Sequence, residues 1–135
     1  MKATSRLIDV AGTALLPLNL RREGITAYQC PEEDAYDFVV SIEGRLIRIE
    51  LKAVNGDSEY PTAEKITKKQ FDSADFIVIY LLDKNQNRFF TIPTKKMPRN
   101  TSIRFTKTKD GKIKGKWMKF EGFDYLKKEI SWWKK

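Results

Sequence analysis

Three side chains between positions 37 and 52 have types and spacing that suit hydrolytic chemistry. Asp37 begins an apolar stretch, and Glu50 and Lys52 lie two residues apart near the end of the next one. Residues two apart on a strand point to the same face of a sheet. If the two stretches pair as a hairpin, two carboxylates and an ammonium group converge at one sheet edge. Such a cluster suits a divalent cation and a water nucleophile.

The residues between these side chains predict the hairpin. The pair Glu43-Gly44 separates the two apolar stretches and is the expected turn. The second stretch alternates an apolar row with a charged row: Ile47, Ile49 and Leu51, against Arg48, Glu50 and Lys52. The same alternation also fits a plain half-buried strand with a solvated face and a weak Glu–Lys ion pair.

The segments before the hairpin predict a helix and a short strand. Thr4 and Ser5 can cap a helix with apolar residues at helical spacing, and Gly24 is a suitable stop. Pro17 is expected to kink or interrupt this helix, because proline lacks the backbone donor. Residues 25–30 are predicted as a strand, followed by an acidic loop over 31–34.

The segments after the hairpin predict a second helix and two more strands. A turn over 55–58 precedes an expected helix over 62–71. The apolar run 75–82 is expected to be a central strand covered on both faces. Residues 85–87 are expected to turn the chain, and 88–92 to return antiparallel.

The C-terminal part is basic and is expected to contact a polyanion. Residues 101–135 contain 11 Lys and Arg against 4 Asp and Glu, whereas residues 1–100 contain 15 against 14. Strands over 102–108 and 112–120 are expected to flank the turn Asp110-Gly111, before a helix over 123–133. The candidate nucleic-acid contacts are Arg104, Lys107, Lys109, Lys112, Lys114, Lys116 and Lys119. On charge alone, a solvated face or a lysine-protected sheet edge fits equally.

Composition limits the remaining possibilities. The 135 residues are expected to form one mixed α/β domain, with a core over 1–100 and a basic hairpin and terminal helix over 101–135. No apolar run reaches the length of a membrane span, and no signal peptide is recognised. The single cysteine, Cys30, is expected to be structural, and the expected location is the cytoplasm. The absence of histidine excludes His-based triads and His general bases.

The spacing Asp37, Glu50-x-Lys52 resembles the PD-(D/E)XK nuclease superfamily. The flanking sequence is similar to its small single-domain branch, which includes group I intron homing endonucleases and Holliday-junction resolvases. The similar segments are 43–52, 75–80 and 88–93. The resemblance implies a restriction-endonuclease-like domain, in which a central mixed sheet is flanked by helices.

The resemblance also implies roles for individual residues. Asp37, Glu50 and the backbone carbonyl of Leu51 are expected to hold Mg²⁺, with Mn²⁺ as a substitute, and Lys52 to orient the attacking water. Many relatives carry a glutamate on the first helix, where this chain has no acid over 11–14, so Asp9 is the nearest candidate ligand. Gln70 is the candidate polar residue on the helix after the lysine.

The function expected from these observations is magnesium-dependent hydrolysis of DNA phosphodiester bonds, in duplex or branched DNA. Cutting both strands needs two active sites, so a homodimer is expected. One alternative is a nucleic-acid-binding module on a nuclease-like fold that does not cleave, which the missing helix glutamate favours. Another is a protein-interaction domain whose basic face binds an acidic protein.

Overall fold

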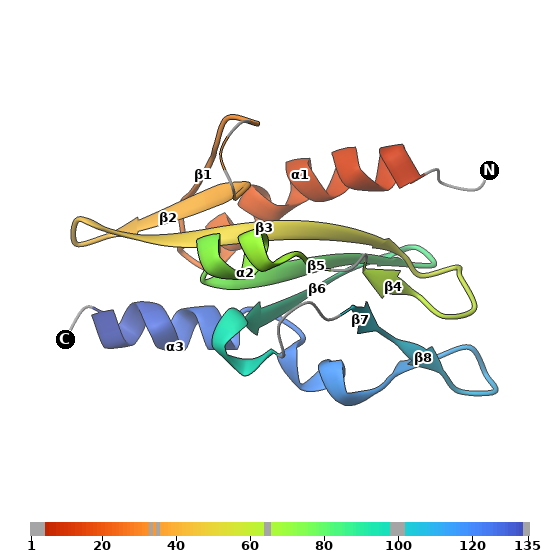
Figure 1. Ribbon diagram of the computed structural model, residues 1–135. Helices are drawn as coiled ribbons and strands as arrows, with labels where there is room; N and C mark the ends of the chain where they lie inside the picture. Colours follow the sequence, from red (N-terminus) through yellow and green to blue (C-terminus); the bar gives the residue numbers. More distant parts are fainter. Residues whose placement is uncertain (1–4, 33, 35, 64–65, 98–101, 134–135) are drawn as a thin grey trace.

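A five-stranded mixed sheet forms the centre of the computed structural model (Figure 1). The structure describes residues 5–32, 34, 36–63, 66–97 and 102–133. The strands, in their order across the sheet, are β1 (Ala27–Gln29), β2 (Phe38–Ile42), β3 (Arg45–Asn55), β5 (Phe76–Asp83) and β6 (Gln86–Pro93). β3 and β5 are parallel, whereas the other neighbours are antiparallel. The expected mixed α/β fold with a central sheet is confirmed.

Both faces of the sheet are covered. The helices α1 (Ser5–Arg22) and α3 (Asp124–Trp133) bury Leu16, Leu20 and Leu126 against one face. The other face packs against α2 (Lys68–Ser73), the 3₁₀ turn η2 (Lys116–Phe120) and two short strand pairs. These pairs are β4 (Thr62–Ala63) with β7 (Ile103–Arg104), and β8 (Thr106–Lys107) with β9 (Ile113–Lys114). β5 is buried from Phe76 to Leu81, as expected for a central strand.

Helix α1 lies close to the sheet because a glycine faces it. A Cβ on Gly12 would lie 2.9 Å from Cδ2 of Tyr80 on β5, so a larger residue does not fit there. Pro17 lies inside the continuous helix, so the expected interruption does not occur. The helix ends where expected: Gly24 has a positive φ, and Ile25 N–H donates to the Leu20 carbonyl.

The β2–β3 hairpin is confirmed. Glu43 and Gly44 have φ of 50° and 78°, which are the positive values of a tight two-residue turn. The ladder runs from Ile42↔Arg45 to Phe38↔Ile49. In the β5–β6 hairpin the turn is Lys84-Asn85, so it starts one residue before the expected 85–87, and β6 begins at Gln86.

The expected helix over 62–71 is present but starts later than expected. Residues 62–63 form β4, which pairs with β7, and helix α2 starts only at Lys68. Thr67 caps α2 in a reciprocal arrangement: its hydroxyl accepts from Gln70 N, and the Gln70 side chain accepts from Thr67 N. The polar side chain of Gln70 is thereby fixed at the start of the helix.

The expected long strand over 112–120 is wrong. β9 spans only Ile113–Lys114, and Gly115, with φ of 128°, leads into η2. The 3₁₀ turn buries both Trp117 and Phe120, which an extended strand would place on opposite faces. The terminal helix, expected over 123–133, is α3.

Residues 1–4, 98–101 and 134–135 are outside the described part, including the expected capping residue Thr4. None of the helices described is both long and apolar enough to cross a bilayer.

Candidate active site

The candidate site lies where β2 stops and β3 continues. The last paired residues are Phe38 and Ile49, and β3 runs on to Asn55. Asp37 N–H donates to the Ile49 carbonyl at 2.8 Å, and the Asp37 carboxylate accepts from Leu51 N–H at 2.7 Å. The side chain of Asp37 thus replaces the missing strand partner. Because the N–H and C=O of one strand residue point to the same side, the Leu51 carbonyl faces this open edge too.

Glu50 lies beside Asp37 and is held by two further side chains. It is buried, at 8% exposure. Gln70 donates to Glu50 Oε1 at 3.1 Å, and Lys52 Nζ lies 3.9 Å from the same oxygen. The cap that fixes Gln70 therefore also fixes the orientation of the Glu50 carboxylate. The sequence spacing predicted that Glu50 and Lys52 lie together. The start of α2 brings the third candidate, Gln70, into contact with the same carboxylate.

Burial raises the pKa values of both carboxyl groups of the site. Burial, and secondarily the neighbouring Asp37 charge, raise the pKa of Glu50 to about 7. Burial also raises the pKa of Asp37, against the opposing effects of Leu51 N–H and Lys52. The two carboxyl groups lie within one hydrogen bond of each other. Two adjacent buried carboxylates repel when both are ionised, and a divalent cation between them would remove that repulsion.

A cleft of about 280 Å³ opens from Asp37 toward helix α1. Asp9 and Thr13 of α1 line it together with Leu51 and Ala53 of β3. Asp9 thus lies on the same cleft as Asp37, whereas Glu50 does not line it. Within the described residues, however, no three side chains of His, Cys, Asp or Glu gather into one metal site, so Asp9 does not form such a group with Asp37 and Glu50.

The loop between β1 and β2 contributes residues that the spacing argument did not include. Cys30 and Glu32 of this loop line the cleft, together with Gln29 at the end of β1. Burial and the nearby acids Asp34 and Asp37 raise the pKa of the Cys30 thiol, which keeps it protonated at neutral pH. Glu32 is exposed, and the acidic composition of residues 31–34 was its only signal.

The seven candidate nucleic-acid contacts divide into separate groups. Lys107, Lys109 and Lys114 line a cleft with Tyr60, and Lys112 lines another beside the β5–β6 turn. Lys116 and Lys119 lie on η2, each over its neighbouring aromatic ring. In the expected strand over 112–120, lysines 112, 114 and 116 would form a row on one face. That row does not form, because Lys116 lies on η2 and not in a strand.

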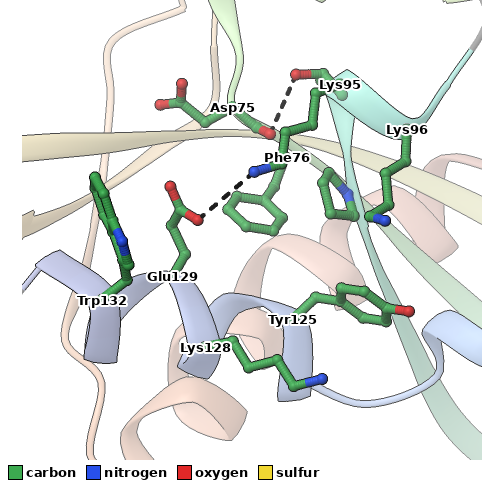
Figure 2. Close-up of a pocket in the computed structure, with 10 residues that line it drawn as sticks. Asp75, Phe76, Lys95, Lys96, Tyr125, Lys128, Glu129 and Trp132 are labelled. Atoms are coloured by element: carbon green, nitrogen blue, oxygen red, sulfur yellow. Dashed lines mark hydrogen bonds and ion pairs between the residues drawn. The ribbon is translucent and has the colours of Figure 1, made fainter.

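A larger cavity, of about 530 Å³, lies elsewhere, between the β5–β6 edge and α3 (Figure 2). Its acids are already engaged: Asp75 accepts from Arg48, and Glu129 accepts from Trp133 and lies 4.0 Å from Lys95. The cavity contains neither Asp37 nor Glu50. Size alone therefore does not identify the reactive site.

No family model and no curated protein sequence matches the chain. Among solved structures it is similar to the bacterial homing endonuclease I-Ssp6803I, with a TM-score of 0.68 and 15% sequence identity. The similarity covers 98% of this chain and 95% of the other. At this identity the similarity establishes the fold: the chain has the fold of a small bacterial endonuclease.

Proposed function

We propose that this protein is a metal-dependent DNA endonuclease. The observation that carries the proposal is the adjacent pair Asp37 and Glu50 at an open strand edge. Asp37 is half-buried and Glu50 is buried, and Lys52 lies beside Glu50. The structural similarity to a homing endonuclease supports DNA as the substrate. Burial and the nearby acids raise the pKa of the Cys30 thiol, which makes it a poor nucleophile and favours a water nucleophile instead.

The residues fit a hard divalent cation. Asp37, Glu50 and the Leu51 carbonyl would hold Mg²⁺ or Mn²⁺, and Asp9 would contact its water shell across the cleft. When bound, the cation would supply Lewis-acid stabilisation of the phosphate and a more acidic water. Hydrolysis of the ester consumes one water: a P–O bond forms to the water oxygen, one P–O ester bond breaks, and the released sugar oxygen takes up a proton to become a hydroxyl, which balances the proton that the water loses.

The protein's own groups would position this reaction. Lys52 would donate a hydrogen bond to the attacking water and stabilise the negative charge that develops on the phosphate oxygens. Gln70 would keep the Glu50 carboxylate directed to the site through its 3.1 Å hydrogen bond. Cleavage of both strands of a duplex, or of a junction, would require two copies of the chain.

A cleavage assay tests the proposal directly. Plasmid and four-way-junction DNA are incubated with wild type, Glu50→Gln and Lys52→Ala, with and without Mg²⁺ or Mn²⁺. We expect metal-dependent nicking or cutting by wild type and none by either variant. Glu43→Gln makes the same chemical change in the exposed β2–β3 turn and should leave cleavage unchanged. DNA binding without cleavage of any substrate would instead establish a binding module.

A further inference from the structure

Arg104 is held in place by an aromatic ring rather than by an acid. Its guanidinium carbon lies 4.1 Å from the centroid of the Tyr60 ring. Both residues belong to a braced unit: Arg104 pairs with Thr62 across β4 and β7, and Phe105 N–H donates to the Pro61 carbonyl at 2.8 Å. Thr62 also donates its hydroxyl to the Tyr60 carbonyl at 2.7 Å. Hydrogen bonds therefore fix the backbone next to both Tyr60 and Arg104.

Among the described residues, Arg104 has no acidic partner. The residue is exposed, and no carboxylate in the described part of the chain lies within ion-pair distance of it. Arg48 and Arg88, by contrast, direct their guanidinium groups to Asp75, and to Asp83 and Glu121. A guanidinium that lies over an aromatic ring can still use its N–H groups as hydrogen-bond donors.

Tyr60 also lines a basic cleft of about 460 Å³ next to the β8–β9 hairpin. Lys107, Lys109 and Lys114 line it, against one carboxylate, that of Glu59. Figure 1 shows β7 leading directly into β8, so the strand that ends at Arg104 is followed at once by the strand that carries Lys107. Lysine ammonium groups are point charges that suit phosphates, whereas an oriented arginine fork suits a planar pair of acceptors.

We propose that Arg104, positioned by Tyr60, reads a base in the DNA substrate while Lys107, Lys109 and Lys114 contact the phosphates. This inference rests on the proposed function. The base is guanine, whose N7 and O6 in the major groove accept two parallel hydrogen bonds from an arginine fork. Contact with the Tyr60 ring restricts the Arg104 side chain before binding, which lowers the entropy lost on contact. Phosphate contacts alone do not distinguish one DNA sequence from another. An arginine held in one orientation toward a base edge would add that discrimination.

The test is selection of bound duplexes from a randomised DNA pool at fixed salt and without divalent cations, followed by affinity measurements. Arg104→Lys keeps the charge but loses the fork, so it should lose a guanine preference at one position, by about tenfold or more. Tyr60→Leu should weaken the guanine preference at the same position of the DNA site, because the arginine fork is no longer oriented. Lys109→Ala should weaken binding to all sequences alike and lower the slope of log affinity against log salt by about 1.

Each outcome decides the inference. A uniform loss of affinity in Arg104→Lys, like that of Lys109→Ala, would make Arg104 a phosphate contact and overturn the base-reading role alone. The same conclusion follows if wild type selects no base at any position. Failure of wild type to bind duplex or branched DNA at low salt would overturn the proposed function itself. As a control, each variant should unfold at the same temperature as wild type, which excludes misfolding as the cause of a loss of affinity.

Discussion

Replacing Glu50 by glutamine should stabilise the protein at neutral and alkaline pH. Glutamine has the same shape, and its carbonyl can still accept the hydrogen bond from Gln70. In wild type, burial and Asp37 raise the pKa of Glu50 from 4.5 to about 7. At about 1.4 kcal/mol per tenfold change in proton affinity, ionising this folded-state carboxyl costs about 3 kcal/mol. Glutamine avoids that cost.

The pH dependence has a definite sign. A carboxyl whose pKa is raised by folding binds its proton more tightly in the folded state than in the unfolded chain. Its effect is absent below about pH 4.5, where Glu50 is protonated in both states, and it destabilises wild type progressively up to about pH 7. The variant should therefore match wild type near pH 4 and exceed it by up to about 3 kcal/mol near pH 8.

Urea unfolding in EDTA, followed by tryptophan fluorescence between pH 4 and pH 8.5, measures this difference. Trp117 is buried in the core and provides a signal. Glu43→Gln, in the exposed turn, should differ from wild type by less than about 0.5 kcal/mol at every pH. A Glu50→Gln variant that is less stable than wild type at pH 8, or equally stable throughout, would refute the reasoning. Added Mg²⁺ should stabilise wild type more than the variant, because only wild type has the full carboxylate pair.

Three further substitutions test other parts of the structure. Lys52→Met should lower single-turnover cleavage by about 100-fold or more with a smaller change in DNA affinity, and an unchanged rate would remove Lys52 from the mechanism. Gly12→Ala should lower the melting temperature, because the clash with Tyr80, at 2.9 Å, outweighs the gain of about 1 kcal/mol in helix propensity. A higher melting temperature would show that α1 can move. Asp75→Ala should cost about 1–3 kcal/mol in urea unfolding, since the backbone N–H of Arg48 loses its acceptor at 2.7 Å. No change would mean that water replaces the carboxylate.

The hairpin and its charged row could be predicted because their determinants are local. Alternation over 45–52 and the pair Glu43-Gly44 are enough to set the faces and the turn. Where β2 stops is not a local property. The hydrogen bond from Leu51 N–H to the Asp37 carboxylate depends on where β2 stops, and no pattern in the sequence predicts that bond.

The errors came from contacts distant in sequence. Thr62 and Ala63 follow a proline and precede a helix, which favoured one longer helix, but they pair with residues some forty positions later. The capping box at Thr67 and Gln70 was the better local signal for the helix start. The lysine row beyond Gly115 fails because Trp117 and Phe120 are both required in the core.

The two-residue turn at Glu43-Gly44 also constrains how this site can change in evolution. The residue numbers of every β2–β3 pair add to the same total, and Asp37 and Glu50 each lie one residue beyond the last pair. The number of paired residues in the hairpin therefore sets the distance of both acids from the turn. A single inserted residue in either strand would slip the register and send one acid to the opposite face. Length variants that keep both acids in place should add residues to the two strands together, in steps of two per strand.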